Sequence, residues 1–322
     1  MRALTLPGTT LTVAALCLGT AEFGAAIARA DAFRLLDAYT DAGGNFIDTA
    51  KVYADWRPGE RSIGEKTIGA WLRQRNGRDR LIIATKGVHP DLARMGVPRL
   101  APADIAADIE ASQRNLGVDA LDLWYLHRDD ESRPVTEIIE TLNAQVAAGR
   151  IKHFGCSNWR TERIAAAQAY AQSHGLQGFR ANQMMWSLAA VNHKALGDPT
   201  LVAMDAAMAR LHTQTQLAAA PYTSQAHGFF HKLDAGAISS AGAFRDGAYA
   251  DPVNRTRYAR LRELRAQTGL SLTQLVLGYL MAQPFPTVPV IGPASLAQLM
   301  DSLTAVDVTL SSEEVAYLTA DN

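Results

Sequence analysis

The sequence predicts a single α/β domain over residues 1–322, a closed (β/α)8 TIM barrel with an N-terminal β-hairpin closing the barrel bottom. Two observations favour this fold class. Eight short apolar runs alternate with longer amphipathic stretches from end to end, as in a parallel barrel. The first run is not followed by the G-x-G-x-x-G turn that a doubly wound sheet would need. A barrel of this size is commonly one domain.

The predicted elements alternate between strand and helix. The hairpin is expected from Leu4 to Leu6, through a Pro7-Gly8 turn, and back from Leu11 to Ala14. The expected barrel strands are Val13–Leu18, Asn45–Asp48, Leu81–Thr85, Leu121–Leu126, His153–Ser157, Gly178–Gln183, Gln216–Pro221 and Thr287–Ile291. The expected helices include Ala30–Ala42, Ala103–Leu116, Val135–Ala148, Thr161–His174, Leu201–Leu211 and Leu272–Met281. Residues 231–255 have little periodicity and are predicted to form a long, lid-like loop.

Composition argues against several classes of function. The formal net charge of −1 gives no reason to expect nucleic-acid binding, and no apolar run approaches the ~20 residues that span a membrane. Two cysteines, Cys17 and Cys156, favour a reducing, cytoplasmic setting, with a catalytic thiol as the lesser alternative. Residues 28–30 resemble a signal-peptidase site, so export is a second alternative, but the preceding stretch fits the hairpin better. No residues have the spacing of metal ligands, so no metal is expected.

Titratable side chains follow three consecutive predicted strands, where a parallel barrel places its active site. Asp48 ends the second strand with Tyr53 just beyond it, Lys86 ends the third, and His127 ends the fourth. Tyr53 could protonate a carbonyl oxygen if a lysine lowered its pKa from about 10. Asp48 would hold Lys86, and His127 would hydrogen-bond the carbonyl or relay the proton. Each residue alone has a structural alternative, such as an ordinary loop tyrosine or an ion pair, but the four together favour catalysis.

Five stretches resemble the aldo-keto reductase family in order and spacing. They are GGNFIDTAKVY (43–53), LIIATK (81–86), LDLWYLH (121–127), IKHFGCSNW (151–159) and NQMMW (182–186). The likeness covers nearly the whole chain. It is closer to the sugar-reductase and channel-subunit branches of the family than to human aldose reductase. It implies that Asp48, Tyr53, Lys86 and His127 are the catalytic tetrad.

The resemblance also implies a nicotinamide cofactor, NADP(H), with NAD(H) as a second usable form. It assigns Ser157, Asn158 and Gln183 to the carboxamide, Trp186 to a stack on the nicotinamide ring, and Thr20 to the adjoining ribose. The other implied contacts are Tyr222, Thr223, Ser224, Gln225 and Gly228 over the pyrophosphate, and Gly292, Ser295, Gln298 and Ser302 in the C-terminal motif. The chain departs from the family in having Thr223-Ser224 instead of Ser-Pro and Ser302 instead of Asn. Ala294 stands where relatives have Arg, Lys or Ser for the 2′-phosphate, which leaves the dinucleotide choice open.

Aromatic residues near the catalytic positions are the predicted walls of the substrate pocket: Phe23, Trp56 and Trp159, with Trp124 expected in the core. No arginine is clearly placed to require an anionic substrate; Arg128 and Arg160 are candidates for such a contact, but surface or helix-start positions are the more common interpretation. The expected function is reduction of an aldehyde or ketone, including sugars, or oxidation of the alcohol. The expected partner is a small molecule, with the chain a monomer or homo-oligomer. The alternative is a cofactor-binding regulatory or redox-sensing subunit with little turnover; we expect the enzyme, since no extension precedes the predicted hairpin.

Overall fold

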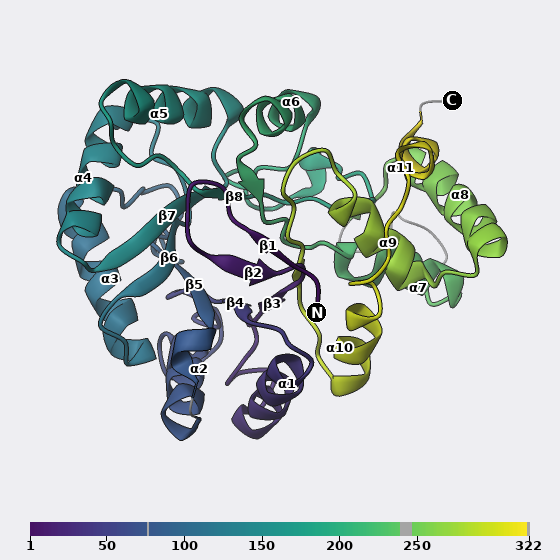
Figure 1. Ribbon diagram of the computed structural model, residues 1–322, viewed down its shortest axis with the longest axis horizontal. Coiled ribbons are helices and arrows are strands. Elements are labelled where there is room, and N and C mark those ends of the chain that lie inside the picture. The colour runs from purple at the N-terminus through teal and green to yellow at the C-terminus, as the bar shows by residue number, and fades with distance from the viewer. Residues whose placement is uncertain (76, 239–246, 321–322) are drawn as a thin grey trace.

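A barrel of parallel strands forms the centre of the computed structural model, which describes residues 1–75, 77–238 and 247–320 (Figure 1). Eight strands neighbour one another in the order β10-β3-β4-β5-β6-β7-β8-β9. Backbone hydrogen bonds from Val288 to Ala219 and from Val290 to Pro221 link the two ends of this sheet, so the barrel closes. The strands are β3 (Cys17–Gly19), β4 (Phe46–Asp48), β5 (Ile82–Gly87), β6 (Leu121–Leu126), β7 (Ile151–Ser157), β8 (Ala181–Gln183), β9 (Ala218–Ala219) and β10 (Val290–Ile291). The predicted fold class is confirmed.

The predicted N-terminal hairpin is also present. β1 (Ala3–Thr5) pairs antiparallel with β2 (Thr12–Ala14), and Figure 1 shows the pair lying across the ring of strands. Leu6 and Val13 are buried in one cluster with barrel residues such as Phe46. Burial of this apolar surface is what holds the hairpin over one end of the barrel. The opposite end is therefore the one left for a site.

Helices surround the barrel, and five of the six helices expected by range begin and end within one residue of the predicted bounds. None of those in the described ranges is long and apolar enough to cross a membrane. The helices are α1 (Arg29–Asp41), α2 (Ile63–Gln74), α3 (Pro102–Leu116), α4 (Val135–Ala147), α5 (Thr161–Ser173), α6 (Ala206–Thr215), α7 (Phe229–Asp234), α8 (Val253–Thr268), α9 (Leu272–Met281), α10 (Leu296–Leu303) and α11 (Ser312–Thr319). Short 3-10 turns among the described residues include η1 (Arg78–Arg80), η2 (His193–Ala195) and η3 (Ala226–Gly228).

The helix predicted over residues 201–211 begins later, at the start of α6. Asp205 caps it, because its side chain accepts a 2.7 Å hydrogen bond from the Met208 amide. The preceding residues are held in extended backbone, since Val202 and Met204 exchange backbone hydrogen bonds with Met185. The local cap and this pairing beside β8 override the apolar periodicity that predicted an earlier start.

The loop predicted over residues 231–255 is wrong at both ends. Its first residues belong to α7, whose Phe229 and Phe230 are buried in the main core, and its last residues begin α8. Residues 239–246 lie outside the described residues. Aromatic burial therefore stabilises helix where the polar, Gly-rich composition predicted none.

Candidate active site

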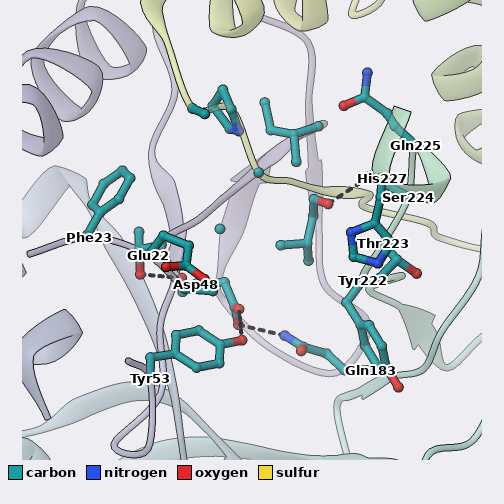
Figure 2. Close-up of a pocket in the computed structure, with 18 of the residues that line it drawn as sticks. Glu22, Phe23, Asp48, Tyr53, Gln183, Tyr222, Thr223, Ser224, Gln225 and His227 are labelled. Carbon is teal, nitrogen blue, oxygen red and sulfur yellow. Dashed lines mark hydrogen bonds between the residues drawn. The ribbon is translucent and has the colours of Figure 1, made fainter. Parts of the chain in front are cut away.

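The carboxylate of Asp48 connects the side chains at the open end of the barrel (Figure 2). Lys86 Nζ donates to Asp48 Oδ2 at 2.6 Å and to the Thr49 carbonyl at 2.8 Å. Gln183 Nε2 donates to Asp48 Oδ1 at 2.6 Å, and the Tyr53 hydroxyl lies 3.4 Å from Oδ2. Asp48 is 1% exposed and Lys86 2% exposed. Three strands and the loop after β4 are thus joined at one buried acid.

The four residues predicted to be catalytic converge in space. Asp48 ends β4, Lys86 lies near the end of the adjacent β5, and His127 follows β6. Lys86 Nζ is 4.7 Å from the centre of the Tyr53 ring. The rings of Tyr53 and His127 are 6.0 Å apart and nearly perpendicular, at 77°. Parallel strand order brings these side chains together because all four follow or end neighbouring strands.

The electrostatics of Tyr53 differ from the prediction. Burial raises the pKa of Tyr53, and the attraction of Lys86 for the tyrosinate offsets only part of that rise. Asp48 adds to the rise, since its negative charge also disfavours the tyrosinate. Lys86 itself stays charged: burial alone would lower its pKa, but Asp48 and Tyr53 outweigh burial and raise it. The tyrosine is therefore held as the neutral acid, next to a fixed positive charge.

His127 is held neutral. Burial lowers its pKa well below the usual range, and the charges of Arg128, His89 and Lys86 lower it further. Its Nδ1 is buried and has no hydrogen-bond partner among the described residues. A neutral imidazole carries one proton, so His127 is able to donate one hydrogen bond to an oxygen.

A single cavity of about 1200 Å³ contains most of the predicted site. It reaches from Trp56 and Tyr53 to Gln298 and Ser302 on α10, and Figure 2 shows Tyr222 to Ser224 on the wall opposite Phe23. The predicted residues that line it are Thr20, Phe23, Asp48, Tyr53, Trp56, Lys86, His127, Ser157, Asn158, Gln183, Tyr222, Thr223, Ser224, Gln225, Gly228, Gly292, Gln298 and Ser302.

Two predicted tryptophans lie outside this lining. Trp186 packs on Phe285 at 5.9 Å and edge-on to Tyr279 at 6.1 Å, so its ring faces the helical layer and not the cavity. Trp159 is completely buried and packs edge-on to Phe179 at 5.1 Å. Neither residue is part of the cavity lining, so the structure gives no support to the predicted stack by Trp186 or the wall by Trp159. Tyr222 is the aromatic residue of the cofactor set that lies on the cavity wall.

The start of α10 also differs from the prediction. Ser295 does not line the cavity; its hydroxyl caps the helix by accepting a 3.3 Å hydrogen bond from the Gln298 amide. The Ala294 amide donates to Gln298 Oε1 at 2.7 Å. These groups are committed within the protein, so they are less available to an anion than predicted. Ala294 itself lies on the cavity wall and is exposed.

The cavity residues that sequence reasoning missed or misjudged include His89, Arg128 and Asp198. Arg128 was interpreted as a surface residue, but it is 7% exposed and donates to the His127 carbonyl, to Thr200 Oγ1 and to Asp198 Oδ2. Asp198 comes from a distant loop, which no local pattern could bring here. His89 stands three residues after Lys86, a strand-end position that could have marked it.

Buried polar atoms on the cavity wall fit a nicotinamide dinucleotide. Gln183 Oε1 and Thr223 Oγ1 are buried without hydrogen-bond partners among the described residues, as expected of groups that face a polar ligand. Asn158 is more committed: its Oδ1 accepts from the Tyr222 hydroxyl at 2.6 Å and from the Val202 amide at 3.0 Å. Asn158 therefore fixes the walls of the site in addition to lining it.

Thiol and metal chemistry receive little support. Cys17 and Cys156 are free and fully buried, and burial raises the pKa of both thiols. Within residues 1–75, 77–238 and 247–320, no group of three or more His, Cys, Asp or Glu side chains could hold a metal ion.

Comparison with known proteins identifies the family. The model of the aldo/keto reductase family matches residues 15–321. This chain belongs to that family. The resemblance seen in five sequence motifs is confirmed, and the chain is an oxidoreductase of the aldo-keto reductase type.

Individual relatives agree with this assignment. The chain is 31% identical to norsolorinic acid reductase stcV of Emericella nidulans, over 94% of this chain and 76% of that protein. It is 29% identical to the uncharacterized oxidoreductase YrpG of Bacillus subtilis, over 96% of this chain and 92% of that protein. Among solved structures, the thermostable aldo-keto reductase Tm1743, determined with the inhibitor epalrestat, matches with a TM-score of 0.73. That match covers 99% of this chain and 98% of the other at 20% identity, and so supports the fold.

The buried pair of Asp48 and Lys86 makes a testable prediction about stability. In Asp48→Asn, Lys86 keeps its buried position without its anion, so the free energy of unfolding should fall by about 3–5 kcal/mol. Adding Lys86→Met removes the unpaired charge and should restore much of that loss. Urea unfolding of the wild type, the single variants and the double variant measures each value.

The exposed pair of Arg114 and Glu110 is a matched control. Both side chains are about two-thirds exposed, and Glu110→Gln should change the free energy of unfolding by less than about 1 kcal/mol. An Asp48→Asn protein as stable as the wild type, or a double variant no more stable than Asp48→Asn, would contradict the assigned role of the buried pair.

Proposed function

We propose that this chain is an NAD(P)(H)-dependent carbonyl reductase, acting on an aldehyde or ketone or on the corresponding alcohol, with Tyr53 as general acid and base. The observation that carries the proposal is the position of the Tyr53 hydroxyl, on the cavity wall beside a charged Lys86, a buried Asp48 and a neutral His127. We infer a cytoplasmic chain acting as a monomer or homo-oligomer. The relatives reported above are named as reductases and an oxidoreductase, and none of these names supports a regulatory subunit.

Different residues on the cavity wall are assigned to the cofactor and to the substrate. When bound, the reduced nicotinamide supplies a hydride to the carbonyl carbon. Gln183, Tyr222 and Thr223 are the groups that we assign to holding and orienting that ring. His127 donates a hydrogen bond from Nε2 to the carbonyl oxygen, which polarises the carbonyl group and orients it.

Proton transfer belongs to Tyr53. Its hydroxyl gives a proton to the substrate oxygen as negative charge develops there, and takes one back in the oxidation direction. The tyrosinate formed in reduction gains the attraction of Lys86, which Asp48 keeps in place and charged. Because Lys86 is fixed before the reaction, this stabilisation needs no movement of the side chain.

The cavity wall supports more than one kind of carbonyl substrate. Phe23 and Trp56 offer aromatic surface, which suits the faces of sugars and of aromatic carbonyl compounds. Five of the relatives are named norsolorinic acid reductases, which adds that compound to the candidates. A screen of aldoses, ketoses, aromatic aldehydes and norsolorinic acid with both dinucleotides tests the proposal; absence of turnover with every compound would overturn it.

The role of Tyr53 is tested by removing its hydroxyl. Tyr53→Phe should lower the rate of carbonyl reduction by about 10²–10⁴-fold, because the general acid is lost while the ring still fills its place. Dissociation constants for both dinucleotides should change by less than about twofold. Tyr222→Phe is the matched control, since it removes a hydroxyl of the same cavity that bonds Asn158 instead of Asp48. Tyr53→Phe with more than half of the wild-type rate would refute the role.

We assign Tyr222, and not Trp186, to the contact with the nicotinamide ring, and this assignment is tested by substituting each residue. Tyr222→Ala should weaken dinucleotide binding by about five- to tenfold, because a ring contact contributes roughly 0.5–1.5 kcal/mol beyond area burial. Tyr222→Phe keeps the ring and should bind nearly as well as the wild type. Titration by tryptophan fluorescence measures both constants. Trp186→Phe is expected to leave them unchanged; if it weakens binding and Tyr222→Ala does not, the assignment is reversed.

The choice of dinucleotide is tested at Ala294. We infer NADP(H) as a slight favourite with NAD(H) usable, since no guanidinium stands at this position to bind a 2′-phosphate. Ala294→Arg should shift the ratio of dissociation constants towards NADP(H) by about tenfold, equivalent to ~1.4 kcal/mol. Ala294→Gln, of similar length without the charge, should shift it much less. A wild type that already prefers NADP(H) by about a thousandfold would show that other residues bind the phosphate.

A further inference from the structure

His89 lies against the catalytic histidine but has no place in the chemistry described so far. It lines the cavity, is 9% exposed, and follows Lys86 by three residues. Its ring is 4.8 Å from the ring of His127, tilted by 69°. The position is therefore next to the group that we assign to the substrate oxygen.

The backbone that carries His89 is strained. Val88 has a φ of +54°, a left-handed conformation that is a clear outlier for a β-branched residue, and its side chain is fully buried. Such conformations persist only where the surroundings enforce them, and they concentrate at functional sites. The strain places the next side chain, that of His89, at the cavity.

An ionic cluster around the buried Asp108 holds this conformation. Asp108 Oδ2 accepts a 2.7 Å hydrogen bond from the Val88 amide. Arg99 donates to both carboxylate oxygens of Asp108 at 3.1 Å, and Lys51 Nζ lies 2.9 Å from Oδ1. Arg99 also reaches the His89 carbonyl at 3.3 Å. Two cations and one buried anion thus fix the main chain on both sides of His89.

The hydrogen bonding of the His89 ring decides what it can offer a ligand. Nδ1 lies 2.8 Å from the Pro90 carbonyl oxygen, which can only accept, so Nδ1 carries the proton. Burial lowers the pKa of His89, and the charge of Arg128 lowers it further, which favours the neutral ring. Nε2 is then an acceptor with a lone pair, and it has no hydrogen-bond partner among the described residues.

The arrangement orders the substrate atoms. The proposed function places the carbonyl oxygen at Tyr53 and His127, and the His89 ring lies 4.8 Å from the ring of His127, near the substrate atoms next to that oxygen. An acceptor at this point can bind a donor that neighbours the carbonyl group. A site built to hydrogen-bond a substrate hydroxyl discriminates strongly against the analogue that lacks it, because the buried acceptor is then left unpaired.

We propose that His89 determines specificity by accepting, at Nε2, a hydrogen bond from a hydroxyl group adjacent to the carbonyl of the substrate. The substrate class is accordingly hydroxy-carbonyl compounds, either aliphatic or aromatic. This inference rests on the proposed function, since it takes the carbonyl oxygen to lie at Tyr53 and His127.

The experiment compares two ketones that differ at one group. In 2-hydroxy-1-phenylethanone a hydroxyl occupies the place of the terminal methyl of 1-phenylpropan-1-one. The ratio of kcat/KM for the two ketones is measured in the wild type, in His89→Leu and in His89→Gln. Intrinsic reactivity differs between the ketones, but it cancels when the ratio of a variant is divided by that of the wild type.

His89→Leu removes the acceptor and should lower this ratio about tenfold, while the rate with 1-phenylpropan-1-one changes little. His89→Gln places an amide oxygen near the former Nε2 and should keep most of the preference. A ratio within twofold of the wild type in His89→Leu would overturn the proposal. Equal losses with both ketones would also overturn it, because His89 would then only position His127. Circular dichroism confirms that the variants fold.

Calorimetric binding of the same two ketones to the protein with bound dinucleotide separates this proposal from the proposed function. A preference for the hydroxy ketone that His89→Leu abolishes, without any turnover by the wild type, would support the contact at His89 and overturn the proposed reductase. Turnover without that preference in binding or rate would leave the reductase standing and overturn the role of His89.

Discussion

The buried carboxylate of Asp48 is the interaction on which the rest of the site depends. Removing an acid and an ammonium group from water costs several kcal/mol per ion, and their attraction offsets this only with excellent geometry and full hydrogen bonding. Asp48 meets that condition, because Lys86 and Gln183 approach its two oxygens at 2.6 Å from strands β5 and β8. The barrel supplies this geometry: strand ends separated by 38 and 135 residues in sequence meet at one carboxylate. The Asp48 carboxylate in turn holds Lys86 in one orientation toward Tyr53.

The charges around Asp48 have opposing effects on the pKa values of neighbouring groups. Lys86 favours the anion of Tyr53, yet burial and Asp48 raise the pKa of Tyr53 more than Lys86 lowers it. Burial, together with the charges of Arg128, His89 and Lys86, keeps His127 neutral. A neutral phenol and a neutral imidazole are both able to donate to an oxygen, so one fixed charge is compatible with two hydrogen-bond donors in the same cavity. This is an environment that stabilises negative charge only where it forms, on the substrate oxygen or on the phenol.

Sequence patterns predicted the barrel and the tetrad because both follow from rules of local order. Strand ends in a parallel barrel face one end, so Asp48, Lys86 and His127 could be placed together without coordinates. No comparable rule predicts which way a side chain points when its residue lies in the loop beyond a strand end. Trp186 was predicted on the cavity and Tyr222 only in a covering loop, whereas the structure turns Trp186 toward Phe285 and presents Tyr222. Arg128 was misjudged for a related reason: its partner Asp198 is 70 residues away in a loop that no periodicity describes.

Strained backbone also occurs beside the cavity. Among the described non-glycine residues with positive φ, Ala54, Val88, Asn158 and Thr223 lie beside catalytic or cavity residues, whereas Ser62 and Gln216 lie at helix ends. Each such conformation costs of order 1–3 kcal/mol and persists only where its surroundings determine it. Hydrogen bonds supply that determination: the Val88 amide is held by Asp108, and Asn158 receives the Tyr222 hydroxyl. Ordinary turns could join these strands with less strain, so the buried polar groups around the cavity stabilise the shape of the site as well as its charges. The core of apolar side chains keeps the barrel folded; this polar layer fixes which side chains face the cavity.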